Sequence, residues 1–134
     1  MSARRVLIVE DEQILAAQLE CELRRSGYEI AGLASSGEEA LCITRKTCPS
    51  VVLMDVRLRG PMDGLEAARL IRKITLAPII YLTGYADVFL RDPSLMQEPC
   101  LCIAKPFVLP DLLSILEVAM APDAHRPGAS RLLM

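Results

Sequence analysis

The sequence is poor in aromatic residues: it contains no tryptophan, three tyrosines and two phenylalanines among 134 residues. Aliphatic side chains must therefore build the hydrophobic core, and 52% hydrophobic residues provide enough of them. A length of 134 residues fits one domain and leaves little room for a second. The composition thus predicts an ordinary globular domain with an aliphatic core.

The chain also lacks a marked excess of charge, since its formal net charge is −2. Nucleic-acid-binding domains usually carry a basic excess on one face, so we expect no direct contact with nucleic acid. No apolar run approaches the roughly 20 residues that a membrane span needs. The apolar run after Arg5 stops at Glu10 and is too short for a signal peptide. We therefore expect no membrane contact and a cytoplasmic location.

Five cysteines are present, an odd number, and no secretory signal accompanies them. A disulfide framework is therefore not expected. The lone His125 offers no plausible zinc partner. We interpret the cysteines as small, free, partly buried side chains.

Short apolar runs alternate with longer segments of helical periodicity. Most of these runs lack polar alternation, which is typical of parallel strands that are covered on both faces. They comprise residues 6–9, 30–33, 51–54, 79–82 and 101–104. The intervening segments carry helix signals: leucine at every fourth position from 15 to 23, possible N-caps at Ser36 and Asp63, and an apolar face from Leu112 to Ala119. Residues 85–98 form the weakest helix candidate because Pro93 interrupts them, and we expect this segment to be mobile.

This order predicts an α/β domain over residues 1–121. Right-handed crossovers between successive strands would give a five-stranded parallel sheet with helices on both faces. Residues 122–134 are rich in proline, glycine and polar residues, so we expect a flexible C-terminal tail or linker there.

Polar residues stand where the apolar runs end. Glu10 and Asp11 follow the first run, Asp55 the third, Thr83 the fourth and Lys105 the fifth. Open α/β sheets bind ligands beyond the carboxyl ends of their strands, so these side chains should meet at one edge. Clustered carboxylates repel one another unless a cation lies among them, and Mg²⁺ prefers such oxygen ligands. A carboxylate beside Mg²⁺, a lysine and a hydroxyl is suited to phosphoryl transfer, with Asp55 as the nucleophile.

These residues belong to five motifs that resemble those of response-regulator receiver domains, in the same order and at nearly the same spacing over residues 4–120. The motifs are Val9-Glu10-Asp11-Glu12, Leu53-Met54-Asp55, Met62-Asp63-Gly64-Leu65-Glu66, Leu82-Thr83-Gly84 and Lys105-Pro106-Phe107. The resemblance implies a flavodoxin-like, doubly wound (βα)5 fold with strand order 2-1-3-4-5.

The resemblance also implies a role for each site residue. Asp55 would be the phosphorylation site and a metal ligand, Asp11 would bind Mg²⁺ directly, and Arg57 would add its backbone carbonyl. Glu10 stands where the family usually has aspartate and would act through a water. Thr83 would bind the phosphoryl group through its hydroxyl, and Lys105 would pair with it. The Lys105-Pro106 peptide bond would be cis.

The function implied is that of a phospho-acceptor that relays a signal by conformational change. Asp55 would receive a phosphoryl group from a sensor histidine kinase or a histidine phosphotransfer protein, with Mg²⁺ as the cofactor. The domain would not be an enzyme beyond catalysing its own phosphorylation and dephosphorylation. Dimerisation on phosphorylation and a downstream protein target, which the sequence does not name, are further expectations.

Two departures from the family pattern stand out. The loop from Asp55 to Asp63 is one residue longer than the commonest form, and Cys102 stands where the family often has a tyrosine or phenylalanine switch. A subgroup of alphaproteobacterial single-domain regulators also lacks that aromatic residue, and residues 81–85 are similar to its motif.

Two alternatives remain at this point. A phosphohydrolase of haloacid-dehalogenase type also uses an aspartate nucleophile, but it needs an acid two residues later, where this chain has Arg57. The other alternative is an interaction module that does not depend on phosphorylation.

Overall fold

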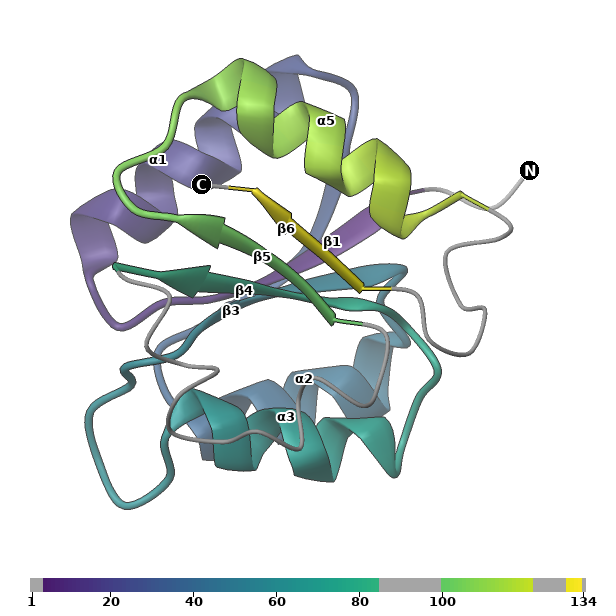
Figure 1. Cartoon of the computed structure of the whole chain (residues 1–134). Helices are drawn as coiled ribbons and strands as arrows, with labels where there is room; N and C mark the ends of the chain where they lie inside the picture. The colour runs from purple at the N-terminus through teal and green to yellow at the C-terminus, as the bar shows by residue number, and fades with distance from the viewer. Residues whose placement is uncertain (1–3, 85–99, 122–129, 134) are drawn as a thin grey trace.

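The computed structural model describes residues 4–84, 100–121 and 130–133 (Figure 1). Strands and helices alternate along most of this part of the chain. They are β1 (Arg5–Val9), α1 (Gln13–Arg25), β2 (Glu29–Ala34), α2 (Gly37–Thr47), β3 (Val51–Asp55), α3 (Gly64–Arg72), β4 (Ile79–Thr83), β5 (Cys100–Ala104), α5 (Leu109–Ala119) and β6 (Ser130–Leu133).

The strands form one parallel sheet in the order β2-β1-β3-β4-β5-β6. The predicted α/β class and the order 2-1-3-4-5 are therefore confirmed. The structure differs from the expected five strands at the C-terminus. Residues 130–133, which we expected in a flexible tail, form β6 and pair with β5 from Cys100↔Ser130 to Ile103↔Leu133. The added strand gives hydrogen-bond partners to the backbone edge of β5, which would otherwise be unpaired.

Helices cover both faces of the sheet, with α1 and α5 on one face and α2 and α3 on the other (Figure 1). Each pair of helices packs an aliphatic cluster against the strands. All residues of β3 and β4 are buried, as are residues 6–9 of β1. Burial on both faces explains why these strands show no polar alternation in the sequence.

The two predicted helix N-caps are present. The Ser36 hydroxyl accepts a hydrogen bond from the Glu39 backbone N–H at 3.1 Å at the start of α2. The Asp63 carboxylate accepts one from the Glu66 backbone N–H at 2.9 Å at the start of α3. Each cap satisfies a backbone donor that has no partner within its helix. The caps therefore fix where α2 and α3 begin, next to the carboxyl ends of the strands.

The expected weak helix and mobile segment at residues 85–98 lies outside the described residues, as does most of the expected tail. Over the parts of the chain that the structure describes, none of the helices has the length and apolar character needed to cross a membrane. The described cysteines at 21, 42, 48 and 102 are free thiols, as expected. Their expected partial burial is wrong for three of them: Cys21 and Cys42 stand at solvent-facing positions of α1 and α2, Cys48 is the C-cap of α2, and all three are exposed, whereas Cys102 is buried.

Candidate functional site

The carboxyl ends of four strands bring the predicted site residues together. Glu10 follows β1, Asp55 is the last residue of β3, Thr83 is the last residue of β4, and Lys105 follows β5. They share a cavity of about 300 Å³ at this edge of the sheet. It is lined by Glu10, Asp11, Glu12, Asp55, Arg57, Arg59, Thr83, Gly84 and Lys105. All six predicted site residues are thus in one place.

Three carboxylates form the centre of the cavity. Oxygen atoms of Glu10, Asp11 and Asp55 all lie within 4.8 Å of one another. Glu10 and Asp55 are buried, and Asp11 is half-buried. Hard, closely spaced oxygen donors of this kind fit Mg²⁺, which commonly takes one or two carboxylates and completes its shell with other oxygens. The donor set therefore matches the predicted metal.

Glu10 shows the electrostatic cost of this crowding. The pKa of its carboxyl is raised to about 7: burial is the largest cause and the nearby Asp55 acts in the same direction, whereas hydrogen bonds from Lys105 and from the Glu12 backbone lower it. Desolvation disfavours the charged form of an acid, and a like charge at short range adds to the effect. A metal ion among these oxygens would offset both the desolvation of the charged carboxylate and its repulsion by Asp55.

Lys105 supplies the positive charge that faces the carboxylates. Its Nζ atom lies 2.9 Å from Oε1 of Glu10 and 3.4 Å from Oδ2 of Asp55. Burial lowers the pKa of Lys105, but its hydrogen bond to Glu10 and the charge of Asp55 outweigh this, so the pKa is raised above its usual value. The ammonium therefore stays charged. The Lys105-Pro106 peptide bond is cis, as the sequence motif implies.

Backbone contacts hold the ends of β4 and β5 beside each other. The Lys105 backbone N–H donates to the Thr83 carbonyl oxygen at 2.6 Å. Thr83 is buried and lines the cavity. The hydroxyl-bearing residue and the ammonium-bearing residue are thus positioned by the same pair of strands.

The loop after β3 contributes backbone donors. The Arg57 N–H donates to Oδ1 of Asp55 at 3.0 Å, and the Arg59 N–H donates to Oδ2 of Asp11 at 3.0 Å. Arg57 lies at the cavity, as predicted, and the ligand role of its carbonyl stays a prediction. Sequence reasoning missed Arg59, because an arginine in a polar loop carries no distinguishing signal.

Gly64 has a steric role that the sequence analysis did not identify. A Cβ atom at this position would lie 2.0 Å from the carbonyl oxygen of Asp55 and 2.9 Å from its carbonyl carbon. The Gly64 backbone N–H donates to the Val56 carbonyl at 3.0 Å. Helix α3 can therefore begin directly against the backbone of Asp55 only because Gly64 has no side chain. The Asp63-Gly64 pair was the available signal, and it indicated only a helix cap.

Cys102 occupies the position of the family's aromatic switch. It is fully buried and pairs in register with Tyr81 of β4, which is also fully buried. Both belong to the aliphatic cluster beneath α2 and α3. The guanidinium of Arg72 lies 6.0 Å from the centre of the Tyr81 ring. An aromatic ring is therefore present in this layer, on β4 instead of β5.

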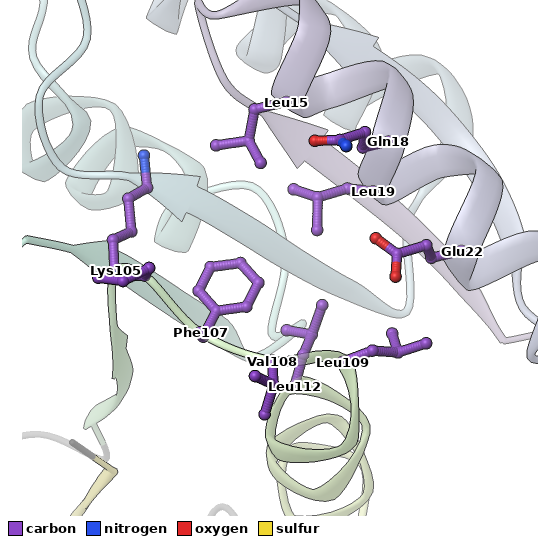
Figure 2. Close-up of a pocket in the computed structure, with 10 residues that line it drawn as sticks. Leu15, Gln18, Leu19, Glu22, Lys105, Phe107, Val108, Leu109 and Leu112 are labelled. Atoms are coloured by element: carbon purple, nitrogen blue, oxygen red, sulfur yellow. The ribbon is translucent and has the colours of Figure 1, made fainter.

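A second, larger cavity of about 550 Å³ lies between α1 and the segment that leads into α5 (Figure 2). Its walls are mostly apolar: Leu15 and Leu19 of α1 face the space from one side and the Phe107 ring from the other. It is lined by Leu15, Gln18, Leu19, Glu22, Lys105, Pro106, Phe107, Val108, Leu109 and Leu112. Lys105 lines both cavities, so the apolar groove adjoins the carboxylate site.

Comparison with known proteins identifies the family of this chain. The family model described as "Response regulator receiver domain" matches residues 6–117. The chain is 36% identical over 118 residues to the transcriptional regulatory protein PdtaR of Mycobacterium tuberculosis, covering 88% of this chain and 57% of that protein. It is 31% identical over 119 residues to the phyllosphere-induced regulator PhyR of Methylorubrum extorquens, covering 88% of this chain and 44% of the relative. The chain thus spans about half the length of these curated relatives.

Solved structures show the same architecture. The receiver domain of PhyR from Erythrobacter litoralis superposes with a TM-score of 0.80 and 31% identity, covering 90% of this chain and 92% of that one. The receiver domain of the sensor histidine kinase PA1611 from Pseudomonas aeruginosa, solved with magnesium in its active-site cleft, gives a TM-score of 0.75 and 27% identity, covering 89% and 98%. The chain belongs to the family of response regulator receiver domains of two-component signalling.

Proposed function

We propose that this receiver domain accepts a phosphoryl group on Asp55 in a Mg²⁺-dependent reaction. One observation carries the proposal: the buried Asp55 carboxylate lies within 4.8 Å of oxygens of Glu10 and Asp11 and 3.4 Å from Nζ of Lys105. A nucleophile surrounded by metal-binding oxygens and a fixed ammonium has the parts that phosphoryl transfer needs, because positioning and charge neutralisation dominate its catalysis.

The metal would be held by the carboxylates of Asp11 and Asp55 and the backbone carbonyl of Arg57, with Glu10 contributing through a water. When bound, Mg²⁺ supplies positive charge against the oxygens of the phosphoryl group. The magnesium in the related PA1611 receiver supports this assignment.

The chain's own residues would perform the transfer. A carboxylate oxygen of Asp55 forms the new bond to phosphorus, while the bond from phosphorus to the donor's nitrogen or oxygen breaks and its electron pair leaves with the donor. The Lys105 ammonium pairs with one phosphoryl oxygen, and the Thr83 hydroxyl donates to another. The Arg57 N–H holds Oδ1 of Asp55 and so orients the carboxylate before the reaction.

The phosphodonor would be a sensor histidine kinase or a histidine phosphotransfer protein in the cytoplasm. The apolar groove between α1 and α5 supports this, because it continues into the site through Lys105. A protein surface bound in the groove would bring its phosphohistidine to Asp55.

The signal would then pass to a protein target. One similar protein, PhyR of Bartonella quintana, is described as an anti-anti-sigma factor, which supports a protein as the target.

The phosphohydrolase alternative is not favoured, because Arg57 occupies the place where such an enzyme needs an acid.

The proposal is tested by incubating the protein with acetyl phosphate and Mg²⁺ and mapping the adduct by mass spectrometry after borohydride trapping. We expect a label on Asp55 that requires Mg²⁺ and is absent from Asp55→Asn. Wild-type labelling of that variant would contradict the assignment.

A further inference from the structure

The loop after β3 contacts two of the three carboxylates through alternate backbone donors. Arg57 donates to Asp55, and Arg59 donates to Asp11, each at 3.0 Å. Gly60 follows Arg59 directly and has a φ of +102°, a conformation that is accessible to glycine but strained for other residues. This turn places the Arg59 backbone and side chain on the Asp11 side of the cavity.

Two of the cations that line the cavity form ion pairs with its carboxylates. Lys105 pairs with Glu10 and Asp55. Among the residues that the structure describes, the charged partner of Asp11 is Arg59, whose Nε lies 3.5 Å from Oδ2. The Arg59 side chain is 88% exposed and lines the cavity, whereas that of Asp11 is 14% exposed. Arg59 thus contacts Asp11 at the cavity while its own side chain stays largely exposed to solvent.

We propose that Arg59 sets how strongly the site binds Mg²⁺ and the phosphodonor. Its guanidinium competes with Mg²⁺ for Asp11 and attracts the anionic phosphodonor. The inference rests on the proposed function and concerns how strongly each ligand binds. It follows from charge alone, because a cation at the cavity repels Mg²⁺ and attracts a phosphate group.

The two effects have opposite signs, and this separates the proposal from a purely structural role. If Arg59 only held the loop in place, its loss would weaken the binding of both ligands. If it acts through charge, its loss tightens Mg²⁺ binding and slows reaction with a phosphate donor. The backbone N–H contact to Asp11 survives side-chain replacement, so the loop keeps one of its two links.

The first measurement is Mg²⁺ binding by isothermal titration calorimetry, with Mg²⁺ alone as the ligand. We expect Arg59→Ala to lower the Kd about two- to five-fold, the range for exposed ion pairs. Arg59→Lys should restore a Kd near that of the wild type. Arg45→Ala, which removes an exposed arginine near the end of α2, is the matched control and should leave the Kd unchanged. Higher salt should shrink the difference between wild type and Arg59→Ala, because screening weakens exposed charges.

The second measurement is the rate of Asp55 phosphorylation by acetyl phosphate at saturating Mg²⁺, where the difference in metal affinity cancels. We expect Arg59→Ala to lower the second-order rate constant for phosphorylation by acetyl phosphate about two- to five-fold. An Mg²⁺ Kd equal to or weaker than that of Arg45→Ala would overturn the inference, and so would an unchanged or faster phosphorylation rate. A wild-type protein that binds no Mg²⁺ would instead overturn the proposed function itself.

Discussion

Nζ of Lys105 donates a hydrogen bond to Oε1 of Glu10 at 2.9 Å, across 95 positions of the sequence. The contact joins the residue after the first strand to the residue after the fifth. Glutamate carries one more methylene than the aspartate that the family usually has here. The longer side chain contacts the ammonium with one oxygen and accepts the Glu12 backbone N–H with the other, at 3.1 Å. Glu10 is therefore tied into the site even when no cation is bound.

The first prediction concerns pH and stability without divalent cations. The folded pKa of Glu10 is about 7, against 4.5 as its ordinary value. The folded state therefore binds the Glu10 proton more tightly than the unfolded chain does, and this binding adds to the free energy of unfolding. The contribution is fully present below pH 4.5 and is lost as the pH rises through 7. The full effect is on the order of 3 kcal/mol, from about 1.4 kcal/mol per unit of pKa.

Glu10→Gln provides the comparison, because glutamine keeps the shape and cannot ionise. Urea unfolding of both proteins in EDTA between pH 4.5 and 8 measures the effect. We expect the variant's free energy of unfolding to rise relative to that of the wild type as the pH increases. A difference that stays constant over this range would contradict the raised pKa.

A second prediction concerns Gly64. Alanine at this position should destabilise the fold by about 2 kcal/mol or more, because its Cβ would clash with the Asp55 backbone. The displacement should also reduce phosphorylation of Asp55, since the clash falls on the residue that carries the nucleophile.

Gly84→Ala is the matched control for stability, because a Cβ there meets nothing within 4 Å. Its free energy of unfolding should change by less than about 0.5 kcal/mol. Thermal or urea unfolding measures both variants. Equal stability of Gly64→Ala and the wild type would show that α3 does not need this close approach.

The third prediction concerns the apolar groove. Val108 is 60% exposed and lines it. Val108→Glu should therefore reduce phosphotransfer from a phosphorylated histidine protein at least several-fold while leaving the reaction with acetyl phosphate unchanged, since the small donor needs no groove.

Leu76→Glu is the matched control. Leu76 is 92% exposed, lies between α3 and β4, and is not part of the groove. Phosphotransfer measured with both donors should be normal in this variant. If Val108→Glu and Leu76→Glu behaved alike with the protein donor, the groove would not be the docking surface.

Much of the fold could be predicted because periodicity and burial leave a direct trace in the sequence. The runs at 51–54 and 79–82 are apolar at every position because helices cover both of their faces. Ser36 and Asp63 indicated helix starts because capping depends on local side-chain chemistry. The edge strand β6 could not be predicted, since the short segment 130–133 pairs through its backbone, and backbone pairing leaves little trace in the sequence.

The site could be predicted in its identities but not in its internal contacts. Strand ends collect Asp55, Thr83 and Lys105 because the topology of a parallel sheet requires it. The pairing of Arg59 with Asp11 depends on the path of a loop, and loop paths depend on turns such as that at Gly60. The role of Gly64 depends on an interatomic distance that only coordinates give.

Lys105 lines both the carboxylate cavity and the apolar groove, so the two cavities share one cation. Binding in the groove and binding of an anion at Asp55 are coupled if both act on this side chain. Such coupling is reciprocal: if a partner in the groove changes the affinity for the anion by some factor, the anion changes the affinity for the partner by the same factor. A phosphoryl group that draws the ammonium toward Asp55 would thus change the groove from which it was delivered.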